Sequence, residues 1–298
     1  MLYKKLGQSS LEISVLSFGC MSLEEDQASA TTLLHKAIDL GINFFDTADL
    51  YQKGMNEEML GKALKEKRND IILASKVGNQ WRPDGSSWDW NPSKVYILAA
   101  ADKSLQRLQT DRIDLYQLHG GTIEDRIDET IEAFEILQQQ GKIRYYGISS
   151  IRPNVIREYI KRSDIVSVMM QYSLLDRRPE EECLTLLQQN KIGVLARGGL
   201  AKGLLAGKPA TDHNGYTKEQ VQHAANTIKN ISTNQRSASQ TALRFVLNNP
   251  AIVSAVIGIR TLAQLEDAAG TLSSPALTER ESVLLSSSLP VTYYDSHR

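Results

Sequence analysis

Eight short apolar segments alternate with helical patterns along the 298-residue chain, and this alternation constrains the fold more than any other feature. The segments are apolar without a two-residue alternation, which is typical of strands in a parallel sheet covered by helices. Eight strand–helix units in a chain of this length favour a closed eight-stranded α/β barrel, with a doubly wound open sheet as the competing architecture. We expect the strands at residues 15–19, 42–45, 71–77, 113–119, 143–148, 165–170, 192–196 and 253–257.

The N-terminal region favours the barrel over the open sheet. No Gly-x-Gly-x-x-Gly motif follows the first strand, where Gly19 stands alone. Residues 3–13 have the pattern of a hairpin, which can close the bottom of a barrel. We therefore expect a (β/α)8 TIM barrel with an N-terminal β-hairpin at its bottom, as a single domain over residues 1–298. Helices are expected at about 28–40, 57–67, 93–109, 125–140, from Pro153 onward, 179–190, 218–229, 237–248 and 262–270, and no regular pattern is expected in residues 78–92 or 286–298.

The composition and charge of the chain argue against several classes of function. The formal net charge is −1, from 34 basic and 35 acidic residues, which gives no electrostatic case for nucleic acid or an anionic membrane. Neither Cys20 nor Cys183 belongs to a pair motif, so we expect no disulfide scaffold and no metal site. No signal-peptide pattern and no long apolar run is present, so we expect a cytoplasmic protein that does not span a membrane. We further expect a monomer or a weak homo-oligomer, with a small carbonyl compound as its substrate.

Polar side chains stand at the C-terminal ends of the predicted strands. In a barrel these ends meet at one face, where active sites lie. The residues that this face would collect are Asp46, Tyr51, Lys76, His119, Ser149, Ser150, Gln171, Tyr172, Arg197 and Arg260.

Four of these side chains, those of Asp46, Tyr51, Lys76 and His119, could act together in proton transfer to a carbonyl group. Lys76 can pair with Asp46 and stabilise the phenolate of Tyr51, because a nearby cation lowers an acid's pKa by about 1–3 units from a tyrosine's usual value near 10. His119 can donate a hydrogen bond that orients a carbonyl oxygen. A proton donor without a nucleophile needs an external reductant, and hydride from a nicotinamide fits. A Schiff-base aldolase using Lys76 is an alternative on the same barrel.

The chain resembles the aldo-keto reductase superfamily, in particular its bacterial NADPH-dependent members. The resemblance runs nearly end to end and is carried by NFFDTADLY at residues 43–51, ASKV at 74–77 and DLYQLH at 114–119. It implies that Asp46, Tyr51, Lys76 and His119 form the catalytic tetrad. It further implies that Tyr51 is the proton donor and that NADPH supplies the hydride, in the manner of an NADP-dependent alcohol dehydrogenase.

The resemblance also implies a cofactor site. Ser150 replaces the family's usual asparagine at the nicotinamide carboxamide, and Arg197 replaces an aromatic residue found in many relatives. Arg260 would bind the 2′-phosphate of NADPH, whereas Ala268 replaces the usual adenine-binding asparagine. The full set of expected cofactor residues is Gly19, Cys20, Met21, Asp46, Ser149, Ser150, Gln171, Arg197, Gly198, Gly199, Leu200, Lys202, Gly203, Gly258, Arg260, Gln264 and Asp267.

The expected substrate pocket is apolar and favours aldehydes and ketones with an apolar arm. Its lining would be Met21, Leu23, Tyr51, Trp81 and Trp88 or Trp90. The short C-terminal tail is expected to leave it open. Some relatives of this fold hold NADPH as ion-channel subunits, so a regulatory subunit with little turnover is the alternative to a reductase.

Overall fold

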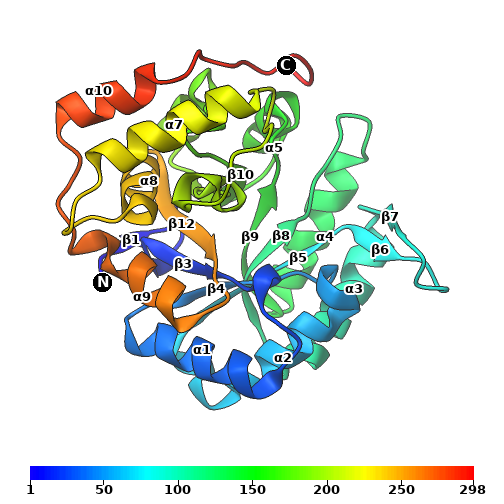
Figure 1. The fold of residues 1–298 in the computed structure, drawn as a ribbon. Coiled ribbons are helices and arrows are strands. Elements are labelled where there is room, and N and C mark those ends of the chain that lie inside the picture. Colours follow the sequence, from blue (N-terminus) through cyan, green and yellow to red (C-terminus); the bar gives the residue numbers. More distant parts are fainter.

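The computed structural model describes residues 1–298, and its centre is a closed barrel of eight parallel strands (Figure 1). Each strand pairs with the next one along the chain, and the last pairs with the first. The prediction of an eight-stranded α/β barrel is therefore confirmed, and the open sheet is excluded. The barrel strands are β3 (Leu16–Gly19), β4 (Phe44–Asp46), β5 (Ile72–Val77), β8 (Ile113–Leu118), β9 (Ile143–Ser149), β10 (Ser167–Gln171), β11 (Gly193–Arg197) and β12 (Ile252–Gly258).

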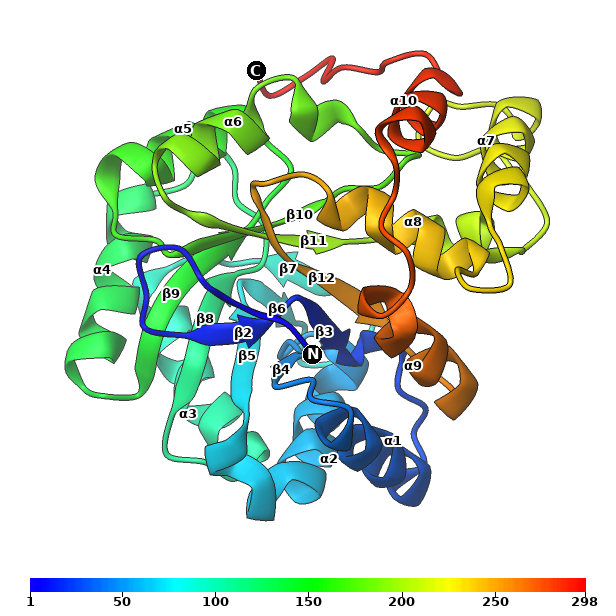
Figure 2. The same cartoon turned by 90° about the vertical axis from the view of Figure 1, so that its left-hand side faces the viewer.

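Helices surround the barrel (Figures 1 and 2). A core cluster of 69 buried residues fills the layer between the strands and these helices. The helices are α1 (Gln27–Asp39), α2 (Met55–Leu64), α3 (Lys94–Leu108), α4 (Ile127–Gln139), α5 (Pro153–Arg162), α6 (Cys183–Gln189), α7 (Lys218–Ile231), α8 (Ala238–Leu247), α9 (Leu262–Ala269) and α10 (Glu279–Ser287). None of them combines the length and the apolar character that crossing a lipid bilayer requires.

The predicted N-terminal hairpin closes one end of the barrel. Strands β1 (Tyr3–Lys5) and β2 (Glu12–Ser14) pair antiparallel, and Leu6, Leu11 and Ile13 belong to the buried cluster that fills the barrel interior. The turn fits closely, because a Cβ at Gly7 would stand 2.2 Å from the carbonyl oxygen of Val166. The hairpin crosses the barrel end in Figure 2.

The structure corrects three sequence expectations. Residues 78–92, predicted to lack regular structure, contain an antiparallel hairpin of β6 (Asn79–Trp81) and β7 (Trp88–Trp90). Helix α10 was not predicted, although Thr278 and Glu281 form a capping box at its start. The predicted helix 179–190 is also shorter, because a 3-10 turn at Arg178–Glu180 precedes α6.

Alternation along the strands places the polar side chains above an apolar layer. Phe44, Ala74 and Leu115 belong to the interior cluster, together with the hairpin residues. Two residues further along each strand stand Asp46, Lys76 and Gln117, and a strand turns every second side chain to the same side. The apolar interior cluster therefore fills the end of the barrel that the N-terminal hairpin closes, and a polar layer begins toward the C-terminal ends of the strands.

Candidate active site

The ammonium group of Lys76 is the centre of the polar layer. Its Nζ donates to Asp46 Oδ2 at 2.6 Å, to the backbone oxygen of Thr47 at 2.8 Å and to the Tyr51 hydroxyl at 3.3 Å. Lys76 and Asp46 are 1% and 3% exposed. A buried lysine with three oxygen partners has its donors satisfied and its position fixed.

Opposing influences act on the two charged groups. Burial raises the pKa of Asp46 above its ordinary value, although the ammonium of Lys76 offsets part of the effect. Burial alone would lower the pKa of Lys76, but Asp46 and Tyr51 outweigh it and the pKa of Lys76 lies above its ordinary value. Lys76 therefore carries its positive charge at neutral pH.

Tyr51 begins the 3-10 turn Tyr51–Gly54, which follows β4 after the short segment 47–50. The preceding segment is tied to β5, because the Thr47 and Asp49 backbone N–H groups donate to the carbonyl oxygens of Ala74 and Lys76 at 2.9 and 3.2 Å. The Tyr51 ring lies edge-on to the ring of His119, with 5.8 Å between centroids. The phenol is thus held between the lysine and the histidine.

His119 is a neutral side chain at the barrel mouth, the end of the barrel where Asp46, Tyr51 and Lys76 meet. Burial, together with the positive charges of Lys76 and Arg197, lowers the pKa of His119 to about 3. Its Nδ1 is buried and has no hydrogen-bond partner in the protein. A neutral imidazole can donate one hydrogen bond without bringing charge to the site.

The structure adds Gln117, which the sequence reasoning missed. Its side chain is fully buried, and its Nε2 donates to Asp46 Oδ1 at 3.3 Å, the oxygen that Lys76 leaves free. The signal was an amide near the end of β8, two residues before His119 and therefore directed to the same side.

The ends of β10 and β11 bring two predicted cofactor residues together. Arg197 donates from Nη1 to Gln171 Oε1 at 3.2 Å, and its side chain is exposed. Gly198 follows with a φ of 74°, and a Cβ there would stand 3.3 Å from Gln171 Cγ. Lys202 and Gly203 have φ values of 58° and 93°, the Gly203 backbone N–H donates to the Leu200 carbonyl oxygen at 2.8 Å, and the Lys202 side chain is exposed.

A cationic side chain, that of Arg260, follows the end of β12. The Arg260 side chain is exposed and enters no ion pair, while its backbone N–H donates to Gln264 Oε1 at 2.9 Å. Gly258 lies close to the segment after β3, because a Cβ there would stand 2.6 Å from Ser22 Oγ. Gly19 is paired with Asp46 in the β3–β4 ladder.

Several predicted cofactor residues have protein partners of their own. Asp267 Oδ1 accepts from Ser237 Oγ at 2.8 Å, and Ser150 Oγ accepts from the backbone N–H of Arg152 at 3.2 Å. Cys20 is fully buried, whereas Met21 is 63% exposed.

Two predicted pocket residues contact the segment that carries Tyr51. The Leu23 backbone oxygen accepts from Gln52 Nε2 at 3.2 Å, and Trp81 donates its indole N–H to the Leu50 oxygen at 3.1 Å. Leu23 is buried, whereas Trp88 lies exposed on β7. Trp81 also lines a cavity of about 490 Å³ that neither Tyr51, Lys76 nor His119 lines.

The C-terminal tail lies on the side of the barrel opposite β4. Its backbone and side chains contact Asn154, Arg178, Glu181 and Tyr216, near the helices that follow β9, β10 and β11. No hydrogen bond joins residues 286–298 to Tyr51, as expected for an open pocket. No three His, Cys, Asp or Glu side chains are grouped to hold a metal ion.

Comparisons with known proteins agree with this geometry. The family model described as Aldo/keto reductase family matches residues 15–287. The uncharacterized oxidoreductase YqkF of Bacillus subtilis is 50% identical, over 99% of both chains. The solved aldo-keto reductase AKR11C1 from Bacillus halodurans superposes in its holo form with a TM-score of 0.94 at 46% identity, covering 100% of this chain and 99% of that one. Its apo form gives a TM-score of 0.85 at 44% identity, with the same coverage.

Proposed function

The chain belongs to the aldo/keto reductase family, and from that premise we propose that it reduces aldehydes and ketones to alcohols with NADPH, with Tyr51 as the proton donor. The observation that carries this proposal is the position of Lys76 Nζ, between the buried carboxylate of Asp46 and the hydroxyl of Tyr51. A phenol beside a fixed cation is a proton donor whose developing negative charge is stabilised where it forms.

The roles of the chain's own groups follow from their contacts. Tyr51 gives its proton to the carbonyl oxygen of the substrate, and Lys76 stabilises the phenolate that remains. Asp46, supported by Gln117, holds the ammonium in place. His119, neutral at physiological pH, donates a hydrogen bond to the carbonyl oxygen and orients it. NADPH, when bound, supplies the hydride.

The residues at the ends of β10, β11 and β12 suit such a cofactor. Gln171 offers an amide, the exposed ammonium of Lys202 suits a pyrophosphate, and the free guanidinium of Arg260 suits a 2′-phosphate. The closer match to the holo than to the apo form of AKR11C1 supports a conformation ready for a ligand.

Two alternatives are less favoured. A Schiff-base aldolase needs a neutral lysine amine, whereas Lys76 is paired with Asp46 and its pKa is raised. Borohydride with a carbonyl substrate should therefore leave Lys76 unlabelled. A regulatory subunit that only holds NADPH would not need the four groups of the tetrad in contact. We further propose one domain over residues 1–298 in the cytoplasm, with small carbonyl compounds as partners.

The decisive test is Tyr51→Phe, which removes one hydroxyl and retains the ring that packs on His119. We expect turnover to fall by about 10²–10⁴-fold, the usual contribution of a general acid, with little change in NADPH affinity. NADPH consumption against a panel of aldehydes, ketones and sugars gives the first number, and a fluorescence titration gives the second. Unchanged turnover in this variant would exclude Tyr51 as the donor.

A further inference from the structure

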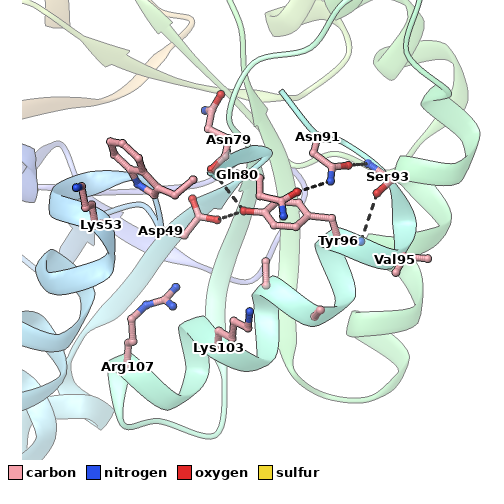
Figure 3. Close-up of a pocket in the computed structure, with 13 residues that line it drawn as sticks. Asp49, Lys53, Asn79, Gln80, Asn91, Ser93, Val95, Tyr96, Lys103 and Arg107 are labelled. Carbon is pink, nitrogen blue, oxygen red and sulfur yellow. Dashed lines mark hydrogen bonds between the residues drawn. The ribbon is translucent and has the colours of Figure 1, made fainter. Parts of the chain in front are cut away.

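A polar cavity of about 490 Å³ lies between the segment that carries Tyr51, the β6–β7 hairpin and helix α3 (Figure 3). A volume of this size is typical of small-molecule sites. No member of the tetrad lines this cavity. The groups that would carry out the proposed reduction are therefore not part of its lining.

Three cations line the cavity from two elements. Lys53 comes from the turn after Tyr51, and Lys103 and Arg107 come from α3. The ion pair of Arg107 with the fully buried Glu57, at 2.6 Å, is the only one formed by a residue lining the cavity. The ammonium groups of Lys53 and Lys103 are therefore left without a carboxylate partner, although Lys53 Nζ stands 5.3 Å from the centre of the Trp81 ring.

The acid facing these cations is Asp49, which is buried. Its Oδ2 accepts from the Tyr96 hydroxyl at 3.3 Å, and its Oδ1 is buried without a partner. Burial and the neighbouring Glu57 outweigh the attraction of Arg107 and raise the pKa of Asp49 to about 8. At neutral pH Asp49 is thus mostly uncharged, and it does not cancel the charge of the two lysines.

A second hollow of about 540 Å³ adjoins the first, and Lys53, Lys103 and Arg107 line both. No hydrophobic residue lines the second hollow, and its other residues include Lys62 and one acid, Glu58. The two lysines without carboxylate partners therefore line both hollows. In the first hollow, the exposed Gln80 and the half-buried Asn91 are joined by a 2.6 Å hydrogen bond and offer further polar atoms (Figure 3).

We propose that this cavity binds a hydroxylated phosphate monoester, with its phosphate between Lys53 and Lys103 and its hydroxyl groups against Gln80 and Asn91. Two lysines without carboxylate partners attract a doubly charged group, and ammonium groups bind phosphate as point charges. The amides supply donors and acceptors that suit hydroxyl groups. Neither the family assignment nor the proposed reduction requires this site.

The test is calorimetry on the chain saturated with NADPH, which occupies the phosphate-binding groups of the barrel mouth. Sorbitol 6-phosphate is the probe, because it has no carbonyl group to be reduced. The variant is Lys53→Gln with Lys103→Gln, both on exposed side chains, and the matched control is Lys229→Gln, an exposed lysine on α7. Circular dichroism of each variant checks that it is folded.

We expect the double variant to bind the probe at least tenfold more weakly than the unmodified chain, since each lost charge-assisted hydrogen bond costs about that factor. The control should bind as the unmodified chain does, and binding should weaken with added salt. Sorbitol without phosphate should not bind. Equal binding by the double variant, or no binding by the unmodified chain, would overturn the site. Inorganic phosphate binding as tightly as the ester would overturn the assignment of a monoester.

Discussion

Replacing Lys76 with methionine separates the structural role of this lysine from its proposed chemical role. Methionine has a similar length and no charge, so Lys76→Met leaves the Asp46 carboxylate buried without its cation. At the observed 2.6 Å, two unit charges attract by about 6 kcal/mol at an effective dielectric constant of about 20. Desolvation of each ion costs several kcal/mol, so the intact pair contributes little net stability, whereas stranding one partner is expensive.

The expected loss in Lys76→Met is about 3–5 kcal/mol in the free energy of unfolding. Adding Asp46→Asn removes the stranded charge, and the double variant should regain most of that loss. Turnover should behave differently. Lys76→Met removes a charge-assisted hydrogen bond to the Tyr51 oxygen, worth about 1.5–3 kcal/mol, or about 10- to 150-fold in rate. The double variant should stay slow, because Asp46→Asn returns no cation.

Urea unfolding followed by circular dichroism gives the stability of each variant, and NADPH consumption gives its turnover. Arg68→Met is a control away from the barrel mouth, since Arg68 pairs with the buried Asp114 at 2.8 Å, and the loss should be smaller than in Lys76→Met because Asp114 keeps Arg144 at 3.1 Å. It should lose stability and keep its turnover per folded molecule. Recovery of turnover together with stability in the Lys76/Asp46 double variant would refute the proposed effect of the lysine on the phenol.

Three further outcomes follow from the structure. The pKa of His119 is lowered from 6.5 to about 3, so between these pH values the unfolded chain binds a proton at His119 and the folded chain does not. The free energy of unfolding should therefore fall as pH drops below 6.5, by up to about 1.4 kcal/mol per pH unit. Urea unfolding of His119→Asn at pH 7, 6 and 5 should show a shallower dependence on pH. Arg260→Ala should weaken NADPH binding about 10- to 100-fold and NADH binding little, by fluorescence titration, and equal weakening of both would remove the 2′-phosphate assignment. Gly61→Ala should destabilise the fold by about 1–3 kcal/mol in thermal unfolding, despite the helix preference of alanine, because its Cβ would stand 2.4 Å from the Arg107 carbonyl oxygen; a rise in stability would contradict that contact.

The barrel could be predicted because most residues of its strands are apolar and buried, and because helices alternate with the strands. The features that were missed also had local signals. Pro83-Asp84-Gly85 is turn chemistry between the short strands β6 and β7, and Asp84 accepts from the Ser86 backbone N–H at 3.0 Å. These strands were missed because three residues each, with polar positions among them, leave almost no periodicity to detect.

The tetrad could be predicted because its members stand at strand ends, where topology alone brings them together. The cavity beside α3 could not be predicted from the sequence. Asp49, Lys53 and Tyr96 meet there because of how a turn, a hairpin and a helix pack, and no periodicity in the sequence specifies that packing. Trp81 illustrates the difference, because its indole is directed to the Leu50 oxygen and its ring lines this cavity.

The polar layer in the barrel is where the demands of folding and of chemistry conflict. A barrel interior is most stable when apolar side chains fill it, as Phe44, Ala74 and Leu115 do in the layer below. One layer higher the same three strands carry Asp46, Lys76 and Gln117, all buried, and their polar atoms are satisfied largely by one another. Apolar residues there would remove the desolvation cost without harming the fold, so stability alone does not account for the ion pair. What it provides is a fixed cation 3.3 Å from the Tyr51 hydroxyl, held by a carboxylate whose other oxygen accepts a hydrogen bond from Gln117.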